Sequence, residues 1–361
     1  MQVVAVLEHR SKKITVPLDA VDADATVTIV EKTHLPFLGY LVAAAEVKRH
    51  FRKSDPDLVL GDHAGLASLL VVALGTWYGV PAVVRLGGNP ARIYRERRAA
   101  FRRRGRYGQV MKYVVLQSIA QLLFRYADGF VVVSEDLRDR IVPRVTCSPD
   151  RVVVVPPVID VDRYDGANGT AWRERVDADQ LILTVTNLSF RGKYDGVRDS
   201  ISGIAPVLAA NADAAYVVAG DGLYYDDVVA FADRRIDDES VRERVHLPGF
   251  VSDVADLYAS ADLVVYVSYI DGYPNVVRES QAVGLPVVAT PGYGVSEQIE
   301  DGVDGFLIDD TRESLRETVT RLLADPDERD RVAVNARARV SRENAPQANG
   351  EAFVAALSDL A

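Results

Sequence analysis

Short apolar runs separated by helix-length segments recur along the chain, and this alternation constrains its fold more than any other feature. Strands that alternate with helices form βαβ units, whose parallel strands are buried on both faces. The first half contains six such runs, at residues 3–7, 26–30, 57–60, 81–84, 130–134 and 152–155. The second half contains six more, at 181–186, 214–219, 244–247, 262–268, 285–290 and 305–308. Two sets of six strands predict an α/β fold with two doubly wound, Rossmann-like domains.

The stretch 155–169, VPPVIDVDRYDGANG, is rich in Pro, Gly and Asp and is predicted to link the two domains. We therefore expect an N-terminal domain at 1–165, a C-terminal domain at 166–344, and a final helix at 345–361 that packs back on the N-terminal domain. Doubly wound sheets bind ligands at the carboxyl ends of their strands. Functional residues are thus expected on the loops after the strands, where the two domains would face an interdomain cleft.

The charge balance limits the classes of partner. The 361 residues carry a net charge of −10, and an acidic surface disfavours binding to nucleic acid. Asp (36) outnumbers Glu (16) and Arg (35) outnumbers Lys (7), a bias typical of halophilic adaptation to high salt or of genome base composition. The single cysteine, Cys147, excludes a disulfide framework or a cysteine-based metal site within one chain.

Two segments bear on targeting. The N-terminus, MQVVAVLEHR, becomes charged too early for a signal peptide. Residues 64–84 carry no charge and are long enough for about one bilayer crossing. Gly79 and Pro81 divide this run into a helix-length and a strand-length piece, which favours the core of an α/β domain. The sequence therefore predicts a cytoplasmic protein.

Two loops of the second half suit a phosphorylated ligand. Arg191 and Lys193 follow the first strand of that half, where a guanidinium fork and a point charge could bind a pyrophosphate. A solvated basic turn is the alternative. Gly220 and Gly222 follow the next strand, where they let the backbone approach a ligand or simply make the strand-to-helix turn.

The segment DGYPNVVRESQAVGLPVVAT places two carboxylates around the start of a helix. Asp271 precedes Pro274, which suits the first helical position. The backbone N–H groups of Asn275 and Val276 are then available to an anion. Asp271 can accept hydrogen bonds from sugar hydroxyls, and Glu279, inside the helix, can bind a vicinal diol such as a ribose. The alternative is a turn acid followed by an exposed helix residue.

This segment resembles the donor-site signature of family 4 glycosyltransferases, retaining enzymes of the GT-B fold. Their pattern is two acids separated by seven residues, then a small-residue helix and a GLPVVAT-like strand. VVAGDG, HLPGFVSDVADLYASADLVVYVS and PGYGVSEQIEDGVDGFLI resemble neighbouring segments of the family, and ADGFVVVSEDLRDRIV resembles its last helix and strand before the hinge. The resemblance extends over most of the second half and implies a GT-B architecture.

The resemblance also implies a role for each acid and cation. Glu279 would bind the donor ribose, and Asp271 would contact the transferred sugar beside the start of the helix. Arg191 and Lys193 would bind the diphosphate. The chain departs from the family at two positions, because Asp271 stands in place of the usual Glu and Asn187 stands where the family often has Arg.

The family is usually described as metal-independent, and the second half lacks a DxD motif after a strand. The resemblance therefore implies a reaction without a metal or cofactor, in which the nucleotide diphosphate sugar is a co-substrate. Cations and helix N-termini would stabilise the departing diphosphate. The leaving phosphate would accept the acceptor's proton on the face of attack, so that no protein nucleophile is required.

Acceptor binding in this fold falls to the N-terminal domain. His63 follows its third strand, while Arg85, Gly87 and Gly88 follow its fourth, and we expect these residues to bind the acceptor. The glycine pair could cradle a phosphate or a sugar, whereas a lone His is more often structural. The family's glycine loop after the first strand is replaced here by LEHRSKK.

Residues 92–124 combine a basic run with a largely uncharged, aromatic-containing helix. Eight arginines fall within 92–106. We expect this segment to contact an anionic membrane surface and a lipid-phosphate acceptor. A solvated helix that pairs with the acidic surface and an RNA-binding stripe are the alternatives, of which RNA is the least favoured.

The sequence thus predicts a retaining hexosyltransferase that uses a nucleotide diphosphate sugar and a glycan or lipid-linked saccharide acceptor. We expect it in the cytoplasm, peripheral to the inner face of the cell membrane. A nucleotide-sugar epimerase is a rival that the Asp271–Glu279 motif disfavours. A catalytically inactive, nucleotide- or sugar-binding partner in glycan assembly is the rival of another class.

Overall fold

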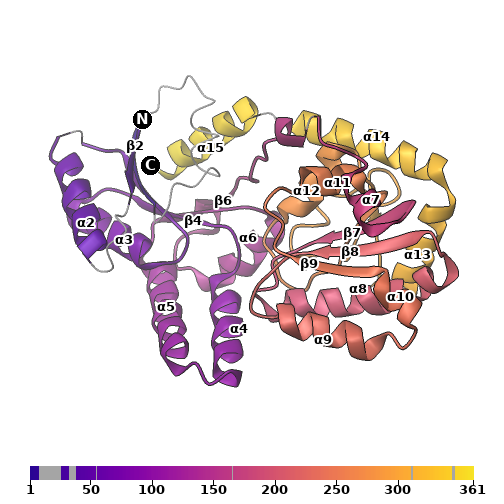
Figure 1. Ribbon diagram of the computed structural model, residues 1–361. Helices are drawn as coiled ribbons and strands as arrows, with labels where there is room; N and C mark the ends of the chain where they lie inside the picture. Colours follow the sequence, from indigo (N-terminus) through magenta and orange to yellow (C-terminus); the bar gives the residue numbers. More distant parts are fainter. Residues whose placement is uncertain (8–25, 32–37, 54, 165, 310–311, 344–345) are drawn as a thin grey trace. The chain divides into compact units, whose positions relative to one another are not determined.

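The computed structural model describes residues 1–7, 26–31, 38–53, 55–164, 166–309, 312–343 and 346–361 (Figure 1). The chain divides into two compact units. Unit 1 contains Met1–Val158 and Asn344–Ala361, and unit 2 contains Ile159–Glu343. The passage from unit 1 to unit 2 falls inside the linker predicted at 155–169. Among the described residues, each unit contains one parallel sheet of six strands, which confirms the predicted α/β fold of two Rossmann-like domains.

The sheet of unit 1 has the strand order β2-β1-β3-β4-β5-β6. Its strands are β1 (Gln2–Leu7), β2 (Thr26–Glu31), β3 (Leu58–Asp62), β4 (Ala82–Leu86), β5 (Gly129–Val132) and β6 (Val152–Val154). Every residue of β3, β4 and β5 is buried, as expected for parallel strands covered on both faces. The order reverses between β1 and β3, so the carboxyl ends of these strands form the switch point where such sheets bind ligands.

The helices of unit 1 follow its strands. They are α2 (Leu38–Phe51), α3 (Leu66–Tyr78), α4 (Pro90–Arg103), α5 (Tyr107–Tyr126) and α6 (Glu135–Ile141), with short 3-10 helices η1 (Val142–Arg144) and η2 (Pro149–Arg151). Gly79, at φ 71°, ends α3, so the uncharged run at 64–84 forms α3 and the start of β4. Within the part of the chain that the structure describes, no helix has both the length and the apolar character needed to cross a membrane.

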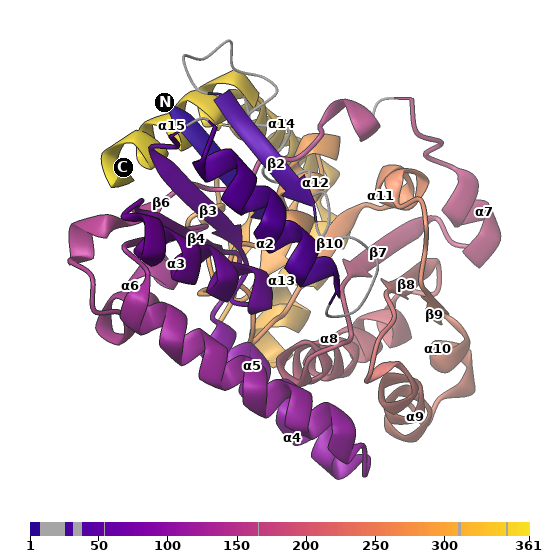
Figure 2. The same cartoon turned by 90° about the vertical axis from the view of Figure 1, so that its left-hand side faces the viewer.

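The Arg-rich segment forms a helical hairpin. Helices α4 and α5 lie side by side in both views (Figures 1 and 2). Tyr113 of α5 packs against two aromatic rings of α4, with centroids 5.7 Å from Phe101 and 6.0 Å from Tyr94. Of the α4 arginines, Arg95, Arg102 and Arg103 are exposed, whereas Arg92, Arg97 and Arg98 are partly buried.

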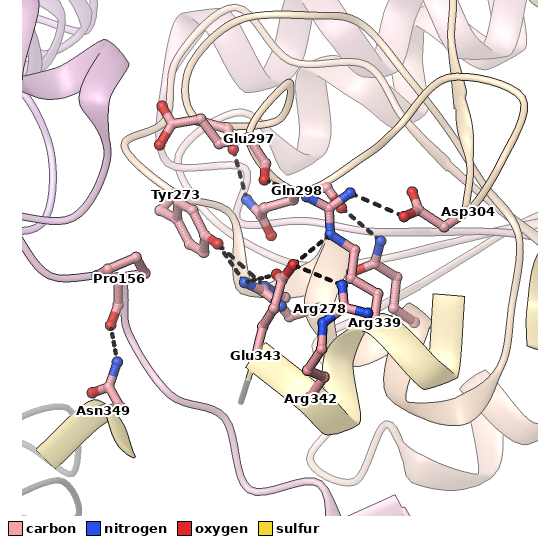
Figure 3. Close-up of polar contacts among 12 residues, drawn as sticks. Pro156, Tyr273, Arg278, Glu297, Gln298, Asp304, Arg339, Arg342, Glu343 and Asn349 are labelled. Carbon is pink, nitrogen blue, oxygen red and sulfur yellow. Dashed lines mark hydrogen bonds and ion pairs between the residues drawn. The ribbon is translucent and has the colours of Figure 1, made fainter. Parts of the chain in front are cut away.

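The final helix, α15 (Pro346–Leu360), belongs to unit 1. Its side chains Phe353, Leu357 and Leu360 join the apolar core formed with β1, β3, β4 and β5. Asn349 Nδ2 donates to the carbonyl oxygen of Pro156 at 2.8 Å, which connects the helix to the start of the predicted linker (Figure 3).

The sheet of unit 2 has the strand order β12-β11-β10-β7-β8-β9. Its strands are β7 (Gln180–Val185), β8 (Ala214–Ala219), β9 (Val245–Gly249), β10 (Leu263–Tyr266), β11 (Val287–Ala289) and β12 (Phe306–Leu307). The chain builds outward from β7 first through β8 and β9, and then on the other side through β10. The switch point therefore lies at the carboxyl ends of β7 and β10.

Helices cover both faces of the unit 2 sheet (Figure 1). Helix α8 (Arg191–Ala210) and α13 (Arg312–Ala324) pack on one face through a continuous apolar core. A second core joins the other face to α7, α11, α12 and α14. The bounds of the remaining helices are η3 (Asp162–Tyr164), α7 (Ala171–Val176), α9 (Tyr225–Arg235), α10 (Glu239–Glu243), α11 (Ala255–Ser260), α12 (Asn275–Val283) and α14 (Pro326–Glu343).

Candidate functional site

The first turn of α8 lies against the loop that follows β10 because two glycines leave room for it. A Cβ atom at Gly192 would come 2.8 Å from Ile270 Cγ2, and one at Gly196 would overlap the carbonyl oxygen of Val267. The backbone N–H of Tyr269 donates to the carbonyl oxygen of Gly192 at 3.3 Å. This close approach joins the loops that follow β7 and β10 at the switch point of the sheet.

Lys193, in this first turn, contacts Asp271 in the loop after β10. The Lys193 ammonium donates to Asp271 Oδ2 and to the hydroxyl oxygen of Tyr266, and it lies 4.6 Å from the centre of the Tyr266 ring. The Tyr266 hydroxyl also donates to Asp271 Oδ2. Lys193 is only 8% exposed. The structure thus brings together two of the residues expected in the donor site, and adds Tyr266 to them.

Asp271 stays ionised although it is buried, because its neighbours stabilise the carboxylate. Burial alone would raise the pKa of its carboxyl, but Lys193, Tyr266 and the backbone N–H of Gly272 together hold the pKa below its ordinary value. Burial, and then the charge of Asp271, raises the pKa of Tyr266. At neutral pH the site therefore holds a carboxylate beside a neutral phenol.

Helix α12 begins one residue later than predicted. Pro274 is its N-cap, with φ −69° and ψ 118°, and Asn275 is the first helical residue. Pro274 therefore does not occupy the first helical position. Among the described residues no side chain caps this helix end. Because N–H groups in a first turn have no intrahelical acceptor, those of Asn275 and Val276 are suited to an anion beside Asp271.

Glu279 lies one turn inside α12 and contacts two tyrosines. The Tyr258 hydroxyl donates to Glu279 Oε2 at 2.9 Å, and the Tyr164 hydroxyl also hydrogen-bonds to Glu279. The rings of Tyr164 and Tyr258 meet edge to face, with centroids 5.8 Å apart. Burial, and then the charge of Glu279, raises the pKa of both phenols, so both remain donors. The two tyrosines orient a carboxylate that can also accept hydrogen bonds from a diol.

Arg191 is the first residue of α8 and remains at the edge of the site. Its Nε donates to both carboxylate oxygens of Asp195, at 2.9 and 2.8 Å, and its guanidinium lies 5.0 Å from the centre of the Tyr194 ring. The side-chain oxygen of Asn187 accepts from the backbone N–H of Ser189 at 2.9 Å. Asn187 therefore shapes the turn before α8, whereas Arg191 places a cation at the N-terminus of α8.

Gly220 and Gly222, at φ 156° and 148°, follow β8 in a conformation that other residues rarely adopt. A Cβ atom at Gly220 would overlap the carbonyl oxygen of Thr186, and one at Gly222 would come 2.6 Å from the carbonyl carbon of Leu188. The two glycines thus allow the loops after β7 and β8 to pack backbone to backbone. This packing within the protein already explains why glycine is needed at both positions.

A network around the buried Arg278 side chain holds the loop between Asp271 and α12 in place (Figure 3). Arg278 of α12 donates from Nη2 to the Tyr273 hydroxyl at 2.7 Å and pairs with Glu343 Oε2 at 3.0 Å. Arg339 of α14 pairs with the other oxygen of Glu343, also at 3.0 Å. Since Tyr273 follows Asp271 by two residues, the network fixes the end of the acidic loop against α14.

In unit 1, Asp62 connects two of the predicted acceptor residues. His63 Nδ1 lies 2.9 Å from Asp62 Oδ2, and Arg85 Nη1 lies 3.4 Å from Asp62 Oδ1. Burial opposes ionisation of Asp62, but His63 and Arg85 outweigh it and lower its pKa. The His63 side chain is 67% exposed, whereas that of Arg85 is 3% exposed. Solvent therefore reaches His63, while Arg85 supports Asp62 from inside the sheet.

The glycines after β4 have more free space around them than the glycines of unit 2 described above. A Cβ atom at Gly87 would meet no atom of the described residues within 4 Å, and one at Gly88 would lie 3.1 Å from Ile93 Cδ1. Gly87 is exposed, so its backbone is open to solvent. The segment LEHRSKK, predicted to replace a glycine loop, lies outside the described residues from residue 8 onward.

The side chains that orient the predicted acids were not predicted from the sequence. Tyr258 lies in a segment that was noted only for its resemblance to the family, Tyr266 lies in a predicted apolar strand, and Asp62 follows the strand predicted at 57–60; none of the three was given a role. A tyrosine in an otherwise apolar strand needs a partner for its hydroxyl, and this requirement was the available signal for Tyr266. No comparable signal marked Arg278, whose partner Glu343 is distant in sequence.

Two family models match the chain, one in each half. The model described as Glycosyltransferase Family 4 matches residues 8–163. The model described as Glycosyl transferases group 1 matches residues 179–325, which contain all the predicted donor-site residues.

Curated proteins and solved structures are similar to the chain over different extents. D-inositol 3-phosphate glycosyltransferase from Mycobacterium sp. (strain KMS) is 31% identical over 195 residues, 51% of this chain and 42% of that protein. Vi polysaccharide biosynthesis protein VipC/TviE from Salmonella typhi is 35% identical over 97 residues, 27% of this chain and 16% of that protein. The chain thus spans less than half the length of these relatives. HepE from Anabaena, solved in complex with UDP and glucose, has the same fold, with a TM-score of 0.73 at 18% identity over 99% of this chain and 100% of HepE.

Proposed function

The chain belongs to the family 4-type glycosyltransferases of the GT-B fold, and from this premise we propose that it transfers a hexose from a nucleotide diphosphate sugar. The acceptor is a glycan or a lipid-linked saccharide, and the anomeric configuration is retained. One observation carries the proposal. The Lys193–Asp271 pair lies beside the uncapped N-terminus of α12, at the switch point of the unit 2 sheet.

The nucleotide is recognised through Glu279. Its carboxylate accepts hydrogen bonds from the two ribose hydroxyls, and Tyr258 and Tyr164 hold it in the orientation needed. HepE was solved with UDP, so UDP is the first nucleotide to test with this chain.

The diphosphate is held by cations and helix ends. Arg191 and Lys193 occupy the first turn of α8, and the first turn of α12 adds the N–H groups of Asn275 and Val276. Helix N-termini and positive side chains both stabilise an anion. These groups can stabilise the charge that develops on the leaving diphosphate, so the reaction needs neither a metal nor another cofactor.

Asp271 acts on the sugar. Its lowered pKa keeps it ionised, so it accepts hydrogen bonds from hydroxyls of the transferred hexose. As the bond from the anomeric carbon to the leaving phosphate breaks, the acceptor oxygen attacks from the same face and passes its proton to a phosphate oxygen. The products are a nucleoside diphosphate and a glycoside with the donor's anomeric configuration.

The acceptor is bound by unit 1. His63, exposed at the carboxyl end of β3 and oriented by Asp62, contacts an acceptor hydroxyl. Arg85 supports Asp62 and acts only through it, whereas the open backbone at Gly87 and Gly88 approaches the acceptor directly.

The α4–α5 hairpin contacts an anionic membrane surface. Its helix α5 exposes Tyr107, Met111, Val115, Leu122 and Tyr126 at helical spacing, which forms an apolar stripe beside the arginines of α4. An apolar stripe flanked by basic residues suits a lipid interface. We accordingly place the protein in the cytoplasm, peripheral to the membrane, in a cell adapted to high salt.

Turnover tests the proposal. Purified protein would be incubated in high salt with nucleotide diphosphate hexoses and saccharide acceptors, and release of nucleoside diphosphate would be measured. We expect release with one donor, and Lys193→Ala should lower turnover more than nucleotide binding. Nucleotide binding without release from any donor would instead favour the inactive-partner alternative.

A further inference from the structure

A cavity of about 350 Å³ in unit 1 is lined by arginines from two segments of the chain, α4 and the continuous stretch of α6 and η1. Arg92 and Arg95 come from α4, Arg140 from α6 and Arg144 from η1. Helix α5 contributes Gln117, Ala120, Gln121 and the buried ring of Phe124. Cavities that bind small ligands range from about 300 to 1,000 Å³, so this one suits a small group. We call it the arginine pocket.

The convergence of these arginines is not a consequence of the basic composition of α4. Arg140 and Arg144 lie outside the run of arginines at 92–106, yet they line the same cavity as Arg92 and Arg95. A solvated basic face would need only one helix. Two segments distant in sequence that both place guanidinium groups at one cavity indicate a site for an anion.

Two of the four charges are already compensated. Arg92 Nε lies 3.3 Å from Glu96 Oε1, and Arg140 Nη2 lies 2.8 Å from Asp136 Oδ1. Arg95 and Arg144 form no ion pair with any residue that the structure describes. The pocket therefore retains about two positive charges, which matches the charge of roughly −1.5 to −2 on a phosphate monoester at neutral pH.

We propose that the arginine pocket binds the phosphate or diphosphate group of a phosphorylated ligand. Arg95 and Arg144 supply the uncompensated guanidinium groups, and Arg92 and Arg140 are held by their carboxylate partners as the remaining donors. The pocket also includes the N-terminal turn of α4, whose dipole favours an anion. The phosphate belongs either to a membrane lipid or to a soluble phosphorylated saccharide.

A second cavity extends the site along the hairpin. Its volume is about 680 Å³, and it shares Arg95 with the arginine pocket. Arg98, Arg102 and Tyr107 also line it. Arg95 therefore lies between two cavities, each of which other arginines also line.

Inorganic pyrophosphate is a suitable soluble probe, and its binding can be measured by isothermal titration calorimetry. The test variant is Arg95→Gln/Arg144→Gln, because both side chains are exposed and their loss leaves no buried group unpaired. The control is Arg234→Gln/Arg235→Gln on α9, which removes the same charge from exposed positions in unit 2. Lys193→Ala serves to weaken pyrophosphate binding at the donor site, so that the two sites can be told apart by affinity.

In the Lys193→Ala background, we expect pyrophosphate to bind with an affinity that Arg95→Gln/Arg144→Gln weakens by at least about tenfold and the control leaves unchanged. Equal affinity in both double variants, or no binding in the Lys193→Ala background, would overturn the proposal. The test of a phosphate site in unit 1 is independent of the test of the donor site. Nucleotide binding by Arg95→Gln/Arg144→Gln should equal that of the wild type, whatever the pocket does.

Vesicle sedimentation identifies the source of the phosphate. Protein would be mixed with vesicles of phosphatidylcholine, with or without phosphatidic acid. Loss of binding to the phosphatidic acid vesicles in Arg95→Gln/Arg144→Gln, but not in the control, would support a lipid phosphate in the pocket. Unchanged vesicle binding, together with weakened pyrophosphate binding, would support a soluble phosphorylated ligand.

Discussion

Replacing Lys193 by Met would remove the cation from the pair at the centre of the donor site. The side chains of Lys193 and Asp271 are only 9% and 23% exposed. Removing one partner of a buried ion pair typically costs about 3–5 kcal/mol, because the other charge stays buried. Asp271 keeps hydrogen bonds from Tyr266 and Gly272, so we expect the lower value, a loss of about 3 kcal/mol in the free energy of unfolding at neutral pH.

The pH dependence of this loss distinguishes the buried pair from a simple packing defect. In the wild type the lowered pKa of Asp271 contributes stability above its ordinary pKa, which is lost as the pH falls through the lowered value. In Lys193→Met, Asp271 loses the largest of the interactions that lower its pKa. Burial then outweighs the remaining hydrogen bonds, so the pKa of Asp271 should rise above its ordinary value. The folded variant then binds a proton more readily than the unfolded chain. Its deficit relative to the wild type should therefore shrink between about pH 8 and about pH 5.

Urea denaturation followed by circular dichroism measures the deficit at both pH values. Adding Asp271→Asn to Lys193→Met should restore part of the stability, because the uncompensated carboxylate is then gone. Lys112→Met, at an exposed lysine, is the control and should change stability by no more than about 0.5 kcal/mol. A deficit that is independent of pH, or one that Asp271→Asn increases, would refute the reasoning.

Three further substitutions test the surroundings of the site. Gly196→Ala should lower the free energy of unfolding by about 1–3 kcal/mol, since its Cβ atom would overlap a backbone carbonyl; Gly87→Ala, with open space around it, should not. Arg278→Met should cost about 1–3 kcal/mol in urea denaturation, because it removes the donors to the buried Tyr273 hydroxyl, whereas Glu343 keeps its ion pair with Arg339; a loss below about 0.5 kcal/mol would contradict the network. Tyr258→Phe should weaken nucleotide binding in calorimetry by about tenfold through Glu279, and unchanged affinity would show that the tyrosine does not orient this acid.

Hydrophobic periodicity predicted the architecture because each parallel strand is buried on both faces. Runs such as AAYVVA coincide with the whole of β8, since all six residues of that strand are buried. The helix that carries Glu279 was likewise predictable, as Pro274 excludes a helix that extends back through Tyr273. Only the position of the helix start was wrong, by one residue.

Contacts between distant segments could not be predicted from local pattern. The pairing of Lys193 with Asp271 depends on Gly192 and Gly196, whose meaning becomes clear only when α8 is seen against the loop after β10. Arg85 illustrates the opposite case. Its place at the end of a strand suggested direct contact with a ligand, but its side chain is buried and pairs with Asp62.

Thermal shift with nucleotides tests the central claim, a donor site built on Glu279, most directly. The purified protein would be heated in high salt with UDP, GDP, ADP and their common sugar conjugates, beside Glu279→Ala. A ligand that binds only the folded state must raise the melting temperature, by the equivalent of about 2.7 kcal/mol at a hundredfold excess over Kd. We predict a rise with one nucleotide that is lost in Glu279→Ala. No rise with any nucleotide, or the same rise in Glu279→Ala, would contradict the account.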